Sequence, residues 1–229
     1  SGLHNCCRRF NWEWREKHMH DYSVRNESKK IAYYWISAIS ILITPVLLEL
    51  LEKIVSRVPA LNDLYKQMNF LGFSISAVLV FTAIWFLFSK RIWKFLAKIK
   101  IGKTPDISGT WTYIGEGKKY SDSDDTNDWK GVIQIEQEYE KILIKLTTEE
   151  SKSHSYSLVG DIEIRDKNEI ILSYMYENEP FQTEEGLKQH KGFCRLTFDL
   201  SNNTANGRYY TDNDRSSYGT MNLAKQERK

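Results

Sequence analysis

Two long runs without any charged side chain limit what this chain can fold into. The first covers residues 31–48 (IAYYWISAISILITPVLL) and the second covers residues 68–89 (MNFLGFSISAVLVFTAIWFLFS). At about 1.5 Å of rise per residue, helices of these lengths match the roughly 30 Å hydrocarbon core of a bilayer. Two buried helices of a soluble protein are the alternative, but too little polar sequence remains to cover both. We therefore predict two N-terminal transmembrane helices, in a membrane domain of residues 30–104.

Basic residues flank the outer ends of both runs: Lys29, Lys30, Lys90, Arg91 and Lys94. The connecting segment 49–67 carries as many acidic as basic residues. Because cytoplasmic loops carry the excess of Lys and Arg, both termini are predicted to be cytoplasmic. An apolar helical face runs on to Val58, just before Pro59, and predicts that the first helix continues past the bilayer core.

The segments on either side of the membrane domain are basic. Residues 90–104 contain six Lys or Arg and no acid, and residues 1–30 contain seven Lys or Arg against four acids. Each such cation adds about 1 kcal/mol of attraction to anionic lipid. We interpret residues 1–29 as a basic cytoplasmic arm and residues 90–104 as a juxtamembrane link. Nucleic-acid binding is the weaker alternative beside a membrane, so no DNA or RNA partner is predicted.

From Pro105 onward the hydrophobic period becomes two, which is typical of half-buried β-strands. Turn-forming clusters, among them the Ser/Asp-rich segment 121–128, separate eight such runs: residues 107–115, 129–137, 141–148, 153–164, 169–176, 192–200, 204–210 and 218–223. Eight short strands favour a closed, antiparallel, lipocalin-like β-barrel, which leaves no exposed edge. A two-sheet sandwich is the alternative. The predicted fold class is membrane α plus all-β, with the eight-stranded barrel at residues 105–229.

The barrel opens with the stretch DISGTWTYIGE at residues 106–116. Ile107, Gly109, Trp111 and Tyr113 share one face of this strand, because side chains alternate along it. The Gly-x-Trp resembles the one that starts lipocalin-like barrels, where it seals one end. We interpret Trp111 as such a seal, and Tyr113, one step further into the barrel, as the better ligand candidate.

No arrangement of residues indicates catalysis. His154 and His190 stand in no recognisable nucleophile motif, and the sequence has no Gly-rich phosphate loop. Cys6, Cys7 and Cys194 make neither a disulfide framework nor a zinc-binding spacing. We therefore predict that the protein is not an enzyme and uses no metal and no cofactor.

Two membrane helices, a short basic link and DISGTWTYIG at the start of a β-rich domain resemble a known family. The family consists of the two-transmembrane, β-strand-rich effectors of bacterial cyclic-oligonucleotide-based antiphage signalling systems (CBASS). The resemblance covers the architecture of residues 30–223, and its motif is residues 106–115. It implies that the barrel is a cytoplasmic sensor for a cyclic dinucleotide made by a partner nucleotidyltransferase. It also implies that binding drives homo-oligomerisation, and that the clustered helices disrupt the inner membrane and kill the infected cell.

A cyclic dinucleotide carries two phosphates, whereas residues 105–229 carry sixteen Lys or Arg against twenty-three Asp or Glu, a net charge of −7. Long-range steering opposes binding, so affinity must come from an Arg fork on phosphate and from bases stacked on aromatic rings. The ligand-binding candidates are Arg195 and Arg208 for phosphate, Thr110 for a base edge, and for stacking Tyr113, Tyr174, Tyr209, Tyr210 and Tyr218. Strand parity places Arg195 on the outer face of its strand. Surface ion pairs and core packing are the alternative roles for these side chains.

Other functions remain open at this point. A membrane-tethered barrel that binds a lipid or another small apolar ligand would have an apolar mouth. A non-catalytic interaction module would have a filled barrel without a cavity. An enzyme that acts on a lipid or a nucleotide is the fourth possibility.

Overall fold

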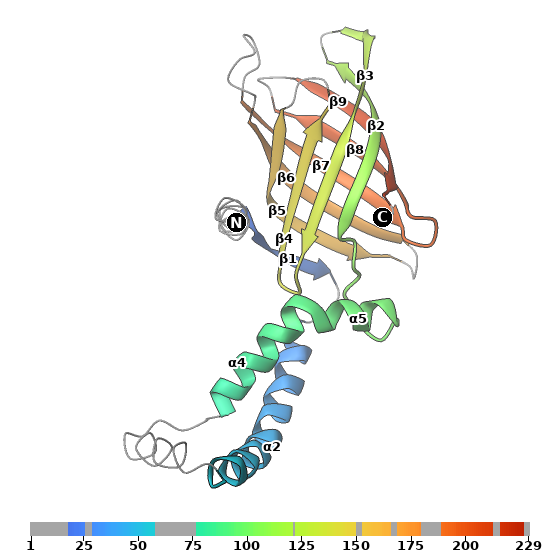
Figure 1. The fold of residues 1–229 in the computed structure, drawn as a ribbon. Coiled ribbons are helices and arrows are strands. Elements are labelled where there is room, and N and C mark those ends of the chain that lie inside the picture. The colour runs from blue at the N-terminus through green and yellow to red at the C-terminus, as the bar shows by residue number, and fades with distance from the viewer. Residues whose placement is uncertain are drawn as a thin grey trace, which may run out of the picture. The chain divides into compact units, whose positions relative to one another are not determined.

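The computed structural model describes residues 18–25, 29–57, 77–120, 122–149, 153–165, 169–179, 189–212 and 216–226. The chain divides into two compact units. One unit, Ser28–Leu96, is helical, and the other, Ser1–Glu27 with Ala97–Lys229, is built of strands (Figure 1). The division follows the change of hydrophobic period in the sequence, except that part of the N-terminal segment joins the β unit.

Helix α2 covers Lys30–Val55 and confirms the first predicted helix. It is long and apolar enough to cross a membrane, and it is the one such helix among the described residues. It continues past residue 48, as the apolar pattern predicts. The second run contains helix α4 (Ala77–Leu87), the π-helix η1 (Phe88–Ile92) and helix α5 (Trp93–Lys98). Its first part, residues 68–76, lies outside the described residues, so the second membrane-spanning helix stays a prediction.

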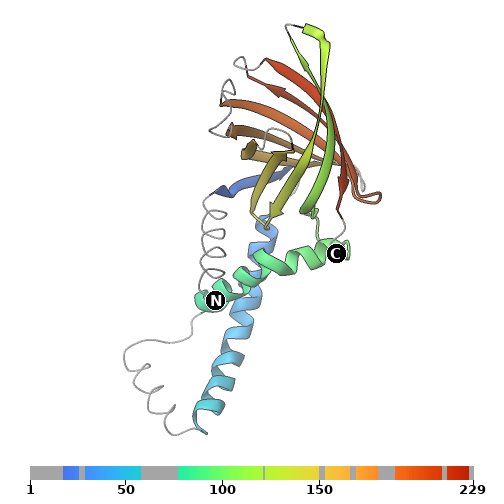
Figure 2. The same ribbon diagram turned by 45° about the horizontal axis from the view of Figure 1, so that its top comes forward.

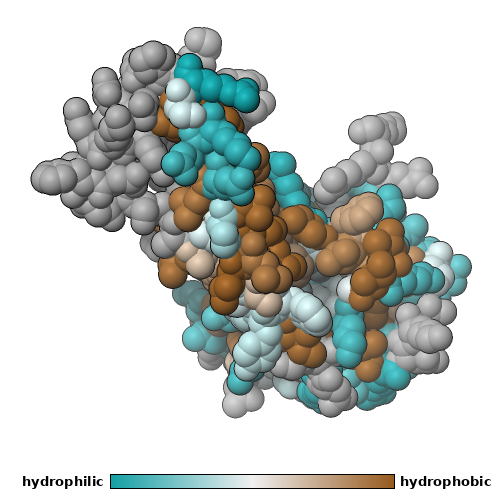
Figure 3. All heavy atoms as spheres, turned by 90° about the horizontal axis from the view of Figure 1, so that it is seen from below, coloured by the Kyte–Doolittle hydropathy of each residue, from teal (hydrophilic) through white to brown (hydrophobic). Residues whose placement is uncertain are grey.

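Helices α2 and α4 meet through an aromatic contact. Tyr33 of α2 stacks on Trp85 of α4 with ring centroids 4.0 Å apart. On α2, Ile36, Ser40 and Thr44 are buried, and both hydroxyls donate to backbone carbonyls one turn earlier. Most other apolar side chains of α2 and α4 are exposed, and hydrophobic residues gather in a broad brown area in Figure 3. Such a surface suits contact with lipid rather than with water.

All eight predicted strands are present: β2 (Gly109–Lys119), β3 (Asp122–Gln137), β4 (Lys141–Thr148), β5 (His154–Ile164), β6 (Glu169–Glu179), β7 (His190–Asp199), β8 (Thr204–Thr211) and β9 (Ser217–Lys225). The prediction of a turn over residues 121–128 is wrong for most of that segment, because β3 begins at Asp122 and pairs with β2 as far as Lys119. Thr126, Asn127 and Asp128, the residues of this segment whose side chains the structure describes, are exposed.

The strands close into a barrel in the order β1-β4-β3-β2-β9-β8-β7-β6-β5, and not into a two-sheet sandwich. The prediction of eight antiparallel strands is short by one. Strand β1 (His20–Arg25), from the predicted basic arm, lies between β4 and β5 and pairs with β5 in parallel (Figure 2). Its Tyr22 and Val24 alternate with exposed residues and join the hydrophobic core, which explains why this short segment is a strand.

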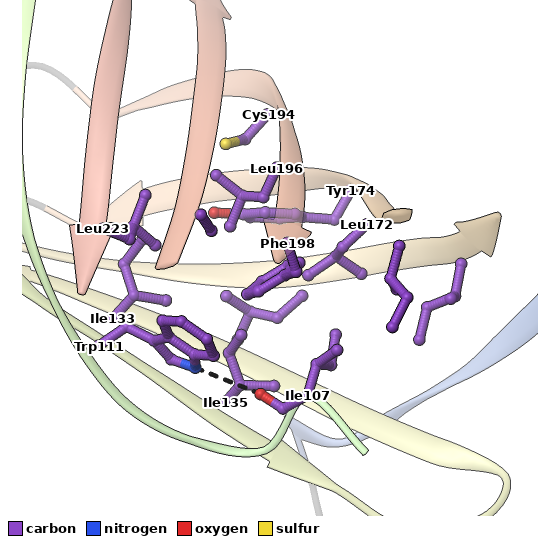
Figure 4. Packing of buried hydrophobic residues seen from close by; sticks show 14 of the residues in the cluster. Ile107, Trp111, Ile133, Ile135, Leu172, Tyr174, Cys194, Leu196, Phe198 and Leu223 are labelled. Carbon is purple, nitrogen blue, oxygen red and sulfur yellow. Dashed lines mark hydrogen bonds between the residues drawn. The ribbon is translucent and has the colours of Figure 1, made fainter. Parts of the chain in front are cut away.

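The hydrophobic core fills the barrel at the end where β2 begins. Trp111 is fully buried and lies edge-on to Phe198, with ring centroids 4.9 Å apart (Figure 4). Its Nε1 donates to the carbonyl oxygen of Ile107 at 3.2 Å. Gly109 precedes it with a φ of +138°, a conformation that other residues rarely adopt. The interpretation of Trp111 as a seal is therefore confirmed.

Candidate functional site

A cavity of about 350 Å³ lies inside the barrel at its other end, where β2 finishes and β3 begins. Every strand from β2 to β9 contributes to its lining. The volume falls within the range of roughly 300–1,000 Å³ that small-molecule sites occupy. Along the barrel axis the interior thus changes from a solid core around Trp111 to a hollow that is large enough for a ligand.

Aromatic side chains form the walls of this cavity. The indole of Trp129 lies between the phenol rings of Tyr113 and Tyr209, edge-on to both, with centroid distances of 4.7 and 5.2 Å. Tyr174 and Tyr176 line the cavity from β6, on the far side of the ring of strands. Since every nucleobase has a flat π-face, rings placed in this way offer surfaces on which bases stack.

Glycines on the neighbouring strands keep the hollow open. The register pairs each of four rings with a glycine: Tyr113 with Gly131, Trp129 with Gly115, Tyr176 with Gly192, and Tyr209 with Gly219. A Cβ at any of these glycines would lie within 2.7 Å of the paired aromatic side chain. Each ring therefore lies over bare backbone, against the wall, and the centre of the barrel stays empty.

Two buried donors in the cavity wall have no hydrogen-bond partner among the residues that the structure describes. They are Nε1 of Trp129 and Nδ2 of Asn178, and both residues line the cavity. The other amide atom of Asn178, Oδ1, accepts a hydrogen bond from Ser155 Oγ at 2.9 Å, which sets the orientation of the amide. An unsatisfied buried donor costs about 1–3 kcal/mol. Acceptor atoms of a ligand would remove that cost, so the geometry favours a ligand rich in acceptors.

The inner end of the cavity is apolar and includes the thiol of Cys194. Ile144, Leu146 and Met221 line it, and Cys194 is buried close to the core residue Leu196 (Figure 4). Burial raises the pKa of the Cys194 thiol to about 12. Because the thiolate is the nucleophilic form, this group supplies no nucleophile at neutral pH.

The mouth of the cavity is polar and basic. Lys118, Lys119 and Lys130 are among its lining residues, with Lys118 beside Tyr218 and Lys130 beside Ile114 at outward-facing positions, and Asp128 carries the one carboxylate among the lining residues that the structure describes. Lys118 also lies 3.8 Å from the carboxylate of Glu116. Among the described lining residues cations outnumber carboxylates, whereas residues 105–229 as a whole carry a net charge of −7.

Comparison with known proteins identifies this barrel. A family described as "Cap15, cyclic dinucleotide receptor domain" matches residues 102–225, a range that includes every residue lining the cavity. The CD-NTase-associated protein 15 of Yersinia aleksiciae is 33% identical over 154 residues, which are 67% of this chain and 71% of that protein. The chain belongs to the Cap15 family. The resemblance to CBASS effectors is thereby confirmed, and the β unit is a cyclic dinucleotide receptor domain of an antiphage signalling system.

The cavity of this receptor domain includes two of the eight residues predicted to bind ligand, Tyr174 and Tyr209. Tyr113 packs against Trp129 in the wall, and its hydroxyl lies 3.5 Å from the carbonyl oxygen of Thr147. Burial raises the pKa of Tyr113 and of Tyr174 well above the usual tyrosine value, so both phenols keep their protons. These three tyrosines are the part of the prediction that the structure brings together.

The other five candidates point away from the cavity, on the outer face of the barrel: Thr110, Arg195, Arg208, Tyr210 and Tyr218. Arg195 lies 3.8 Å from the carboxylate of Glu163. Tyr210 stacks on Phe193 with centroids 5.3 Å apart, and Tyr218 packs on Tyr120 at 4.7 Å. Ion pairing and ring packing therefore account for Arg195, Tyr210 and Tyr218, and the role of the five candidates in ligand binding stays a prediction.

Most lining residues are absent from the prediction, and the three that matter most for ligand binding are Trp129, Tyr176 and Asn178. Trp129 is the first residue of the predicted strand 129–137, where alternation alone does not assign a side chain to the inner or the outer face. A usable signal was present in the neighbouring glycines, since Gly115 and Gly131 alternate with aromatic residues on both strands of one hairpin.

Proposed function

We propose that this chain is a membrane-anchored antiphage effector whose barrel cavity binds a cyclic dinucleotide. Binding drives assembly of several copies, and the assembled transmembrane helices disrupt the inner membrane and kill the infected cell. Both termini and the barrel lie in the cytoplasm, where the partner nucleotidyltransferase releases the signal. The signal is carried by binding and assembly, without a catalytic step.

The observation that carries the proposal is the unpartnered donor pair inside an aromatic cavity of a cyclic dinucleotide receptor domain. Nε1 of Trp129 and Nδ2 of Asn178 suit ring nitrogens, carbonyls or phosphate oxygens of the ligand. The ring of Tyr209 offers a stacking surface worth about 1–3 kcal/mol per base. The lysines at the mouth suit the phosphates, which remain close to water.

The same cavity argues against the competing functions. A site for a lipid or another apolar ligand would have an apolar mouth, whereas this mouth carries Lys118, Lys119 and Lys130. A barrel that serves as an interaction module would be filled by its own side chains, whereas this one encloses about 350 Å³. A polar mouth over an apolar, ring-lined interior suits a molecule with anionic and aromatic parts.

A thermal-shift panel of cyclic dinucleotides on the full chain in detergent tests ligand binding. A ligand at a hundred times its dissociation constant adds about 2.7 kcal/mol of stability, which raises Tm by several degrees. Tyr209 and Tyr210 provide a matched pair, because the first lines the cavity and the second lies outside it. Tyr209→Leu should weaken binding about 10- to 100-fold, the loss of one stacked base, while Tyr210→Leu should leave it unchanged. Absence of a shift with every member of the panel would refute the proposal.

Membrane disruption requires a separate test in cells. Production of the active dinucleotide together with the full chain should collapse the membrane potential, measured with a voltage-sensitive dye. Deletion of residues 31–89 should abolish this effect while the barrel still binds the ligand. Equal loss of potential with the deleted chain would show that the helices are not the toxic element.

A further inference from the structure

Strands β4 and β5 separate part-way along the barrel wall. Near their connection they are paired directly, with Lys145 opposite Tyr156 and Thr147 opposite His154. Beyond that point β1 lies between them, where His20 pairs with Ile142 of β4 and residues 22–25 pair with residues 160–163 of β5 (Figure 2). The space between β4 and β5 that β1 occupies is called the β1 slot below.

The β1 slot is specific for the side chains of β1. Tyr22 is buried, its hydroxyl donates to the carbonyl oxygen of Glu138 at 3.1 Å, and Gln137 Nε2 donates to it at 3.0 Å. On the outer face, Arg25 lies 3.0 Å from the carboxylate of Asp161. A strand that enters the slot thus gains burial, ladder hydrogen bonds and an ion pair, which is the recognition mode of β-strand addition.

The ring of strands does not depend on β1 for closure. Strands β2 to β9 form a continuous series of antiparallel neighbours, and β4 and β5 are joined by their own direct pairing. No hairpin joins β1 to either neighbour, since four residues lead from Arg25 to Lys30, the start of α2. A strand with these properties can leave one barrel and enter another without opening either ring.

We propose that the β1 slot is a strand-acceptor site for the β1 of a second copy, so that copies of this chain assemble by exchanging β1. An exchanged β1 makes the same contacts as a resident one, so the free-energy difference is small and the local concentration of chains decides which form prevails. Confinement of copies in one membrane raises that concentration. The inference deepens the proposed function, on which it rests, because it names the contact through which copies assemble.

The branch point of the β1 slot adjoins the ligand cavity. Ser157, where β4 and β5 part, accepts a hydrogen bond from the backbone N–H of Ile144 at 2.9 Å and lies 2.8 Å from His20 Nε2. Ser155, two residues earlier on β5, lines the cavity and donates to Asn178. A ligand that contacts Asn178 therefore acts on the same stretch of β5 that holds the start of β1.

Cysteine cross-linking of full chains in liposomes tests the exchange. Ser23 and Asp161 are register partners on the outer face, joined by a hydrogen bond, and adjacent strands lie about 4.8 Å apart, within disulfide reach. In a background with Cys6 and Cys7 changed to Ser, chains with Ser23→Cys are mixed with chains with Asp161→Cys. We expect a disulfide-linked mixed dimer whose yield rises with the protein-to-lipid ratio, even without ligand. A Thr197→Cys chain, with its cysteine on the outer face of β7, is the matched control and should give no such product.

A chain with both Ser23→Cys and Asp161→Cys locks β1 in its own barrel. We expect the oxidised chain to bind the dinucleotide like the wild type and to stay unassembled, and we expect reduction to restore assembly. Normal assembly of the locked chain would overturn strand exchange. Strand exchange is also overturned if the internal disulfide forms in the double-cysteine chain but no mixed dimer forms at any protein-to-lipid ratio. If mixed dimers form but the chain binds none of the dinucleotides, the result would support exchange of β1 and overturn the proposal that ligand binding triggers assembly.

Discussion

Replacement of Gly115 by alanine places a methyl group where the indole of Trp129 now lies. The added Cβ would be 2.7 Å from Cε2, 2.8 Å from Nε1 and 3.0 Å from Cζ2, and these side-chain atoms are its three nearest neighbours. No backbone stands among them, so the ring is the part that yields. Because the cavity lies beside the ring, we expect Trp129 to shift into the cavity while the strands stay paired.

The size of this effect follows from the distances. Ordinary contact begins near 3.4 Å, so the indole must retreat from 2.7 Å to 3.4 Å, by about 0.7 Å or more. Overpacking of this kind costs about 1–3 kcal/mol of stability. The loss of one well-placed base contact is worth about 1–3 kcal/mol, which corresponds to an affinity loss of about 10- to 100-fold. We therefore expect a folded chain with a modestly lower Tm and strongly weakened binding.

Isothermal titration calorimetry of the full chain in detergent measures the affinity, and circular dichroism measures Tm. Gly160→Ala is the matched control, because its Cβ would meet nothing closer than His20 Cε1 at 3.4 Å. This control should bind the ligand like the wild type. Wild-type affinity in Gly115→Ala would refute the idea that glycine opposite Trp129 keeps the site open.

Three further expectations concern single side chains. Asn178→Asp retains the acceptor for Ser155 but replaces the unpartnered donor by a carboxylate, so calorimetry should show at least about tenfold weaker dinucleotide binding. Tyr22→Phe removes two hydrogen bonds from β1 and should lower the free energy of unfolding by about 1–3 kcal/mol in urea denaturation, with unchanged affinity as the contrast to Asn178→Asp. Burial lowers the pKa of His20 from its usual 6.5, so the unfolded form binds more protons than the folded one. The contribution of His20 to the stability of β1 is therefore complete above pH 6.5 and is lost as the pH falls below 6.5. Amide exchange of β1, corrected for intrinsic rates, should therefore accelerate relative to β7 from about pH 7.5 to about pH 5.5, and His20→Gln should remove that difference.

Alternation along single strands was enough to predict most of the β unit. Leu196 and Phe198 share the inner face of β7, and Arg195 lies outside, as parity requires. The seal at Trp111 was equally local, since it depends on a glycine two residues earlier in the same strand. Such features follow from a period of two, which a sequence displays directly.

The cavity required knowledge that no single strand contains. Whether an inward ring fills the barrel or lies against its wall depends on the residue opposite it, and therefore on register. Trp129 leaves space because it faces Gly115, fourteen positions away, and Tyr209 does so because it faces Gly219. Residue type alone favoured the exposed Arg208 and Tyr210, since it does not distinguish a tyrosine in a wall from one on the surface.

Strand β1 was missed for a related reason. The segment HDYSVR is short and carries as many charges as apolar residues, so its alternation of Tyr22 and Val24 resembles chance. Its partners lie more than a hundred residues away, on β4 and β5. A strand without a hairpin partner has no local turn signal, and only the space between β4 and β5 explains why it forms.

The ligand cavity and the β1 slot share the wall formed by β4 and β5. A ligand shifts an equilibrium only through contacts that differ between the two states. In the proposed mechanism Asn178 provides such a contact, because its Nδ2 would gain an acceptor from the ligand while its Oδ1 holds Ser155 in the cavity wall. Ser157, two residues further along β5 from Ser155, contacts His20 at the start of the strand that precedes α2, so the proposed signal would pass through this contact. We therefore expect the switch to act through β1, because the ring of β2 to β9 is closed by its own pairings and β1 can move without opening it.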